Sequence, residues 1–110
     1  MALNEAIDMT SGQQKELISL LSGHLPNTEA WIYGSRVRGT SRPGSDVDMV
    51  VFAAPDQARA VSDLRECLEE RNLPFRVDLF VWDEVPGSFR EQIRREHFVL
   101  VSPQVSVDTD

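Results

Sequence analysis

Two closely spaced aspartates carry the chemistry that this sequence most clearly allows. Asp46 and Asp48 lie two residues apart in a predicted strand, residues 46–52, so their carboxylates are expected on the same face. Carboxylates held side by side repel each other, and one stays protonated unless a cation compensates the charge. Mg²⁺ suits this role, because it prefers carboxylate oxygens together with substrate phosphates. Asp46 and Asp48 are therefore candidate metal ligands.

Asp78 is a third candidate ligand, in a predicted strand over residues 75–81. Its neighbours in the sequence are aliphatic, a setting in which an unpaired charge is costly. If the strands pair suitably, Asp78 converges with the other two carboxylates at one end of a sheet. The alternative is that Asp78 forms an ion pair with Arg76 or Arg38.

A glycine and a serine directly follow the short apolar strand predicted at residues 30–33. Gly34 permits a tight turn and lets a phosphate approach the backbone. Ser35 begins a segment whose free N–H groups, together with its own hydroxyl, could receive phosphate oxygens. Gly34, Ser35 and the adjacent Arg36 are therefore candidate nucleotide-binding residues.

The other arginines of this loop leave two interpretations open. Three basic residues lie in this loop of an acidic chain: Arg36, Arg38 and Arg42. Each could contact a phosphate or the molecule that accepts a transferred group. Each could also have a structural role. For Arg38 we favour pairing with a carboxylate of the motif, and the role of Arg42 is left open.

These residues together resemble a known signature. Gly34-Ser35, ten further residues and then Asp46-x-Asp48 is similar to the signature of the polymerase-beta-type nucleotidyltransferase superfamily. The runs GSRVRG and SDVDMVV resemble its minimal nucleotidyltransferase branch, and Asp78 in FRVDLFV fits the third acidic position. The resemblance spans roughly residues 30–81. One departure is Val37, where the branch usually has alanine.

The resemblance implies a two-metal transfer of a nucleotide. Asp46 and Asp48 would hold the Mg²⁺ bound to the triphosphate, and with Asp78 they would hold the Mg²⁺ that activates the acceptor oxygen. Asp78 would also accept the proton of the acceptor hydroxyl. Members of this branch are commonly antitoxins that adenylylate a tyrosine of a HEPN-type toxin. The resemblance therefore implies ATP as the donor and a HEPN-type partner protein.

Two other functions are compatible with the same residues. One is a non-catalytic antitoxin that neutralises its partner by binding alone, although three carboxylates are not needed for that. The other is transfer to a small molecule such as an aminoglycoside, which usually requires an additional acceptor-binding domain.

Periodicity and turn residues predict the elements that must position these groups. A helix over residues 13–22 begins with a capping box of Ser11 and Gln14, and another begins with Ser88 and Glu91. The remaining predicted elements are a helix over residues 55–72, the three strands above and a last short strand over residues 98–101. This order indicates an α/β (α+β) fold: a small mixed sheet with helices packed on one face, which the resemblance implies is the polymerase-beta-type nucleotidyltransferase fold.

Composition limits the alternatives. The 110 residues are expected to form a single domain, with loose ends at residues 1–10 and 102–110. A net charge of −7 argues against binding of nucleic acid or an anionic membrane through a general positive field. A single cysteine, Cys67, excludes an internal disulfide. No signal peptide or membrane span is recognised, so a cytoplasmic location is expected. The oligomeric state is left open between a homo-oligomer and a hetero-oligomer.

Overall fold

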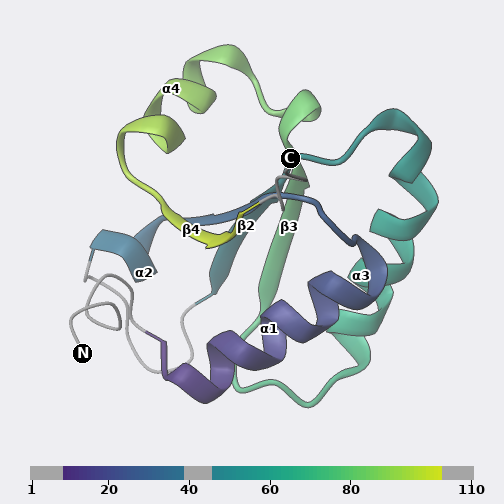
Figure 1. Ribbon diagram of the computed structural model, residues 1–110. Coiled ribbons are helices and arrows are strands. Elements are labelled where there is room, and N and C mark those ends of the chain that lie inside the picture. Colours follow the sequence, from purple (N-terminus) through teal and green to yellow (C-terminus); the bar gives the residue numbers. More distant parts are fainter. Residues whose placement is uncertain (1–8, 39–45, 103–110) are drawn as a thin grey trace, which may run out of the picture.

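Four strands form one mixed sheet in the order β3-β2-β1-β4 (Figure 1). The strands are β1 (Ala30–Tyr33), β2 (Val47–Val51), β3 (Val77–Val81) and β4 (Phe98–Val101). β1 pairs antiparallel with both β2 and β4, whereas β2 and β3 are parallel. The computed structural model describes residues 9–38 and 46–102, except the side chains of Ser35 and Arg38.

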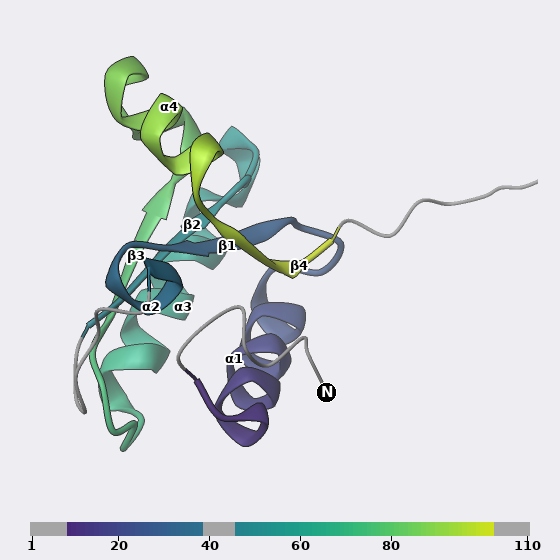
Figure 2. The ribbon, with the colours of Figure 1, turned by 90° about the vertical axis from the view of Figure 1, so that its left-hand side faces the viewer.

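Helices lie on both sides of this sheet. They are α1 (Ser11–His24), the single turn α2 (Ser35–Arg38), α3 (Ala58–Glu70) and α4 (Gly87–Arg95). In Figure 2, α1 and α3 lie on one side of the sheet and α4 on the other. The mixed sheet and its α+β class are confirmed. The predicted helical layer consists of α1 and α3, and α4 adds a smaller layer on the opposite face.

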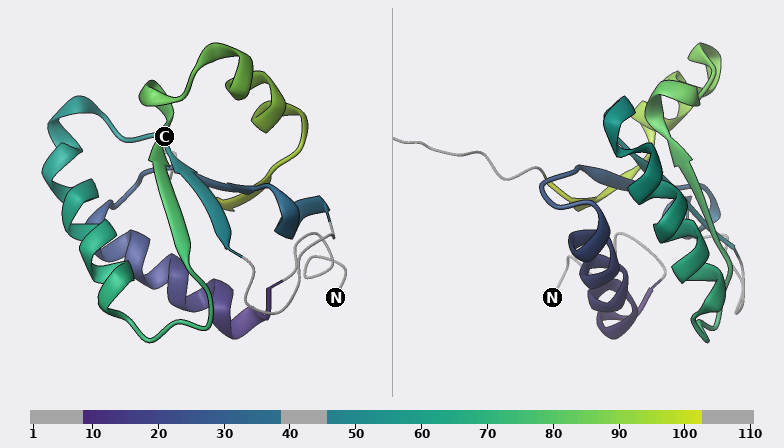
Figure 3. Two further views of the ribbon diagram at one scale, coloured as in Figure 1. Left: turned by 180° about the vertical axis from the view of Figure 1, so that it is seen from behind. Right: turned by 90° about the vertical axis from the view of Figure 1, so that its right-hand side faces the viewer.

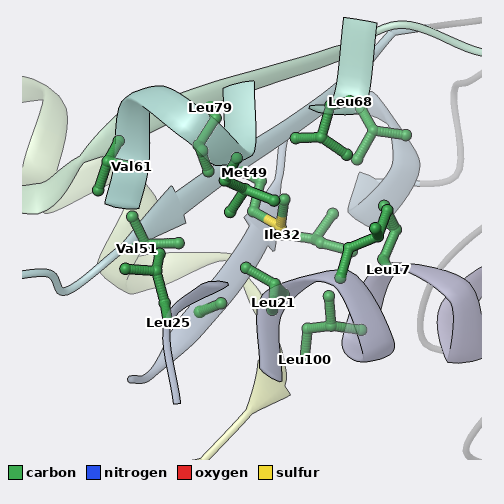
Figure 4. Close-up of a cluster of buried hydrophobic side chains, with 14 of the residues drawn as sticks. Leu17, Leu21, Leu25, Ile32, Met49, Val51, Val61, Leu68, Leu79 and Leu100 are labelled. Atoms are coloured by element: carbon green, nitrogen blue, oxygen red, sulfur yellow. The ribbon is translucent and has the colours of Figure 1, made fainter. Parts of the chain in front are cut away.

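The main core lies between the sheet and the pair α1 and α3 (Figure 4). Alternate residues of β2 point into it, and Val47, Met49 and Val51 are fully buried. Val50 points to the opposite face, where it packs with Tyr33, Val85, Ile93 and neighbouring aromatic residues beneath α4. The central strand β2 is therefore buried on both faces.

The helix starts differ from the sequence prediction. The capping box of α1 is formed by Thr10 and Gln13, one residue earlier than the predicted pair of Ser11 and Gln14. Of the predicted loose lead-in over residues 1–10, the structure describes two residues: Met9 is buried and Thr10 caps α1. The rest of that lead-in, and all of the predicted loose tail over residues 102–110 except Ser102, lie outside the described residues.

The predicted capping box of Ser88 and Glu91 is also wrong. α4 begins one residue before Ser88, and its N-cap is Pro86, which makes no side-chain capping bond. Instead, the Pro86 carbonyl accepts hydrogen bonds from the N–H groups of Phe89 and Arg90. The predicted last strand over residues 98–101 is confirmed as β4. Among the residues that the structure describes, no helix has the length and apolar character needed to cross a membrane.

Candidate active site

Three polar side chains form a row across neighbouring strands. Asp48 of β2 lies in register with Asp78 of β3 on one side and with Tyr33 of β1 on the other. Their sequence neighbours Met49 and Leu79 are buried in the main core, so alternation places the row on the opposite face, the one that carries α4. The pairing of β2 with β3 therefore places Asp48 next to Asp78, as expected if these strands pair.

The carboxylates line two separate hollows. Asp46, exposed and directly before β2, shares with Asp78 a hollow of about 780 Å³ between α3 and the edge strand β3. Asp48 lines a smaller hollow of about 180 Å³, together with Tyr33, Gly34 and residues of α4. Figure 3 shows β3 at the edge of the sheet, with α3 beside it. The site is therefore open on the β3 side and partly covered by α4 on the other.

Asp78 is engaged by a neighbouring arginine. Its Oδ1 lies 3.2 Å from Nε of Arg76, and the side chains are 26% and 77% exposed, respectively. Within the described part of the chain, no three His, Cys, Asp or Glu side chains are grouped closely enough to hold a metal ion. In this conformation the three carboxylates therefore do not converge as expected. Asp78 instead pairs with Arg76, which was the alternative.

Gly34 touches the carboxylate of Asp48. Its φ is +86°, a conformation that side chains with a Cβ rarely adopt. A Cβ built at this position would lie 2.5 Å from Oδ2 of Asp48. The Gly34 carbonyl also accepts a hydrogen bond from the N–H of Val37, which closes the turn into α2. The turn predicted at Gly34 is therefore confirmed, and it adjoins the carboxylate row directly.

Tyr33 is a site residue that the sequence reasoning missed. Its side chain is buried at 7% exposure, and its ring meets that of Phe89 edge to face. Burial, and then the negative charges of Asp48 and Asp78, raise the pKa of Tyr33 to about 12. The hydroxyl is therefore protonated at neutral pH. Its position directly before Gly34 is the one sequence signal that points to it, and the pairing of β1 with β2 places it beside Asp48.

Arg36, a predicted nucleotide-binding residue, is packed into the protein. It is 7% exposed, and its guanidinium lies 5.1 Å from the centre of the Phe75 ring. This position gives Arg36 a structural role beneath the turn, and its nucleotide contact stays a prediction. Ser35 is the first residue of α2, but its side chain and that of Arg38 lie outside the described part, as does Arg42.

Comparisons with known proteins point to one family. The family model described as "Polymerase beta, Nucleotidyltransferase" matches residues 15–105. The chain is 31% identical over 103 residues to the probable protein adenylyltransferase MntA of Haemophilus influenzae, a match that covers 93% of this chain and 90% of that protein.

Solved structures have the same fold. A chain of a toxin–antitoxin crystal structure with AMP-PNP is 26% identical, with a TM-score of 0.68 over 83% of this chain and 74% of that one. A chain from the complex of a tri-AMPylated Shewanella oneidensis HEPN toxin with its MNT antitoxin is 18% identical, with a TM-score of 0.57 over 86% and 73%, and shows the fold alone. Given a family match over most of its length and a relative above 30% identity across both chains, the protein belongs to the polymerase beta nucleotidyltransferase family.

Proposed function

We propose that this protein transfers AMP from ATP to a tyrosine hydroxyl of a HEPN-type toxin, with release of pyrophosphate, and so acts as the antitoxin of a toxin–antitoxin pair. The observation that carries the proposal is the pairing of Asp48 with Asp78 on parallel strands, with the Gly34 turn against Asp48. The donor and partner rest on the relatives, which include a probable protein adenylyltransferase and toxin–antitoxin structures with AMP-PNP or an AMPylated HEPN toxin.

The proposal assigns Mg²⁺ to Asp46, Asp48 and Asp78. The donor set fits this ion, because all three groups offer carboxylate oxygens and two of them are register neighbours. In this conformation Oδ1 of Asp78 contacts Arg76, and the three carboxylates of the described chain are not grouped closely enough to hold an ion, so binding requires their side chains to come together. Bound Mg²⁺ would stabilise negative charge on the attacking and leaving oxygens.

The other groups have roles that follow from their positions. Gly34 and Ser35 would receive phosphate oxygens at the turn beside Asp48, together with Arg36 if its guanidinium reaches them. Asp78 borders the larger hollow, where an acceptor hydroxyl can approach and lose its proton to the carboxylate. Nucleotide and acceptor would therefore meet across the row of Asp48 and Asp78.

A transfer assay tests the proposal. The purified chain is incubated with ATP labelled at the α-phosphate, Mg²⁺ and a candidate HEPN-type protein, and label and mass are measured on that protein. We expect transfer by the native chain. The double variant Asp46→Ala, Asp48→Ala should lose at least about a thousandfold in rate, because metal stabilisation contributes several kcal/mol and each ~1.4 kcal/mol is a factor of ten.

A matched control and two further measurements separate the alternatives. Asp63→Ala removes one exposed carboxylate from α3, away from the site, and should transfer normally. No transfer by the native chain, or equal transfer by the double variant, would contradict the enzymatic function. Full neutralisation of the toxin by the double variant would indicate binding alone, and labelling of an aminoglycoside without any partner would indicate a small-molecule acceptor.

A further inference from the structure

The structure contains a cation of its own at the proposed metal site. Arg76 contacts Asp78 through Nε and Oδ1, and both residues border the hollow that also contains Asp46. We propose that Arg76 is a positioning residue that stands in for the metal ion at Asp78 and is released when Mg²⁺ binds. This inference rests on the metal site of the proposed function.

The charges of the carboxylate row explain why such a residue is useful. Asp48 and Asp78 are direct neighbours on parallel strands, and without a cation their negative charges repel each other. The guanidinium of Arg76 offsets this repulsion when no metal is bound. A metal ion that ligates Asp78 offsets the same charge more strongly, so the two cations compete for one carboxylate.

The backbone around Arg76 is held while its side chain can move. The Arg76 carbonyl accepts a hydrogen bond from the N–H of Val47 at 2.7 Å, and Val47 stands between Asp46 and Asp48 in the sequence. Release of the side chain therefore leaves the pairing of the two strands intact. The backbone position of Asp78 relative to Asp46 and Asp48 is therefore the same with and without the contact between Arg76 and Asp78.

The exposure of the ion pair makes its release easy. The side chain of Arg76 is 77% exposed, so it stays largely hydrated in the contact and its charge is strongly screened by water. Exposed ion pairs of this kind contribute little to stability, and the competition with metal should be correspondingly mild. Arg76 should weaken metal binding by a small factor and should not prevent it.

A metal titration of the Arg76→Gln variant tests the proposal. Mn²⁺ replaces Mg²⁺ as the probe, and the free ion is followed by electron paramagnetic resonance without nucleotide or partner protein. We expect Arg76→Gln to bind Mn²⁺ about two- to fivefold more tightly than the native chain, the factor typical of an exposed ion pair. Arg76→Met, a second neutral variant, should behave in the same way if Arg76→Gln does not fold.

The matched control removes an equal charge from the same hollow. Arg71 also lines it, but its Nε contacts Glu16 at 3.4 Å rather than a carboxylate of the site. Arg71→Gln should therefore bind Mn²⁺ like the native chain. Equal tightening by Arg71→Gln, or unchanged or weaker binding by the Arg76 variants, would overturn the role of Arg76. If neither the native chain nor any variant binds Mn²⁺, the proposed metal site itself is wrong.

Discussion

The close approach of Gly34 to Asp48 leaves no room for a side chain, and a single methyl group tests it. Gly34→Ala places a Cβ 2.5 Å from Oδ2 of Asp48 at a φ of +86°. We expect a loss of about 1–3 kcal/mol in the free energy of unfolding, because the backbone is strained and the carboxylate must shift. Urea denaturation measures the loss, and weaker Mn²⁺ binding would report the shifted carboxylate.

Gly23→Ala is the matched control. Gly23 lies in α1, and a Cβ there would have no atom within 4 Å. This variant should gain about 0.5–1 kcal/mol in stability, since alanine favours a helix over glycine. Equal effects of the two substitutions would mean that the contact with Asp48 has no particular cost.

Tyr33 allows the electrostatics of the site to be measured directly. It is the sole tyrosine of the 110 residues, so the absorbance of phenolate follows this group alone. We expect a midpoint at a pKa of about 12, raised mainly by burial. Since the unfolded chain loses this proton near pH 10, the group contributes stability below pH 10 that is lost between pH 10 and 12. A midpoint near 10 in the folded protein would contradict the burial of Tyr33.

Substitutions of the aspartates separate the causes of this shift. Asp48→Asn should lower the pKa of Tyr33, and Asp78→Asn should lower it less. Both variants should keep the pKa above 10, because burial is the largest cause. Asp63→Asn on α3 should leave it unchanged. Unaltered titration in Asp48→Asn would mean that the two side chains are farther apart than the strand register indicates.

Sequence spacing predicts the Gly34 turn and the shared face of Asp46 and Asp48, whereas the proximity of Asp48 to Asp78 depends on a strand pairing that the structure supplies. Spacing did not predict Tyr33, because its place beside Asp48 depends on which strands pair and in which register. The sequence leaves Arg76 and Arg38 as candidate partners of Asp78. The structure shows the contact with Arg76, and the Arg38 side chain lies outside the described part of the chain.

At the scale of elements, α3 protects the exposed edge of the sheet. The guanidinium of Arg65 donates two hydrogen bonds, from Nε at 3.1 Å and Nη2 at 2.9 Å, to the carbonyl of Leu79 on β3. A strand edge with unpaired backbone groups invites pairing with another chain, and this contact occupies one such group. Arg65 therefore connects α3 to the strand that carries Asp78.

Arg65→Gln should weaken this connection. We expect a loss of about 1 kcal/mol in the free energy of unfolding, the net value of a partly exposed hydrogen bond, and greater self-association of the variant. Urea denaturation and light scattering measure the two effects. Arg59→Gln, an exposed change on the same helix, is the control. The same loss in both variants would show that the contact with Leu79 does not stabilise β3.

The helix starts show where local sequence signals are ambiguous. Thr10 and Ser11 each stand three residues before a glutamine, so two capping boxes compete and only the packing of α1 selects Thr10. At α4 the N-cap is Pro86 and not Ser88. The fixed backbone of Pro86 suits a helix start, and its carbonyl accepts the first hydrogen bonds from N–H groups of the helix.

At the scale of the whole molecule, long-range pairing was beyond the sequence. Nothing local specifies that β3 lies parallel to β2, or that β4 returns to the other side of β1. The position of α4 on the opposite face depends on the same topology, because its buried Ile93 packs against Val50 and Tyr33. Helical periodicity identified an apolar face but not the surface that it covers.

The acidic charge of the chain gives a test of metal binding through overall stability. With a net charge of −7, any salt should stabilise the fold by screening. Mg²⁺ should stabilise the native chain beyond NaCl of equal ionic strength, by about 1.4 kcal/mol at ten times its dissociation constant. Thermal unfolding measures the difference, and Asp48→Asn should retain only the effect of salt. Equal responses to both salts would indicate no specific site.

The strand order also gives the two central carboxylates different mechanical surroundings. β2, which carries Asp48, has a strand on each side and buried layers above and below it. β3, which carries Asp78, has a neighbouring strand on one side only among the residues that the structure describes. If the distance between the two carboxylates changes, we therefore expect the edge strand β3 to move and the central strand β2 to stay in place. Under the proposed function, the central strand would then be the fixed reference against which the nucleotide and the acceptor are aligned.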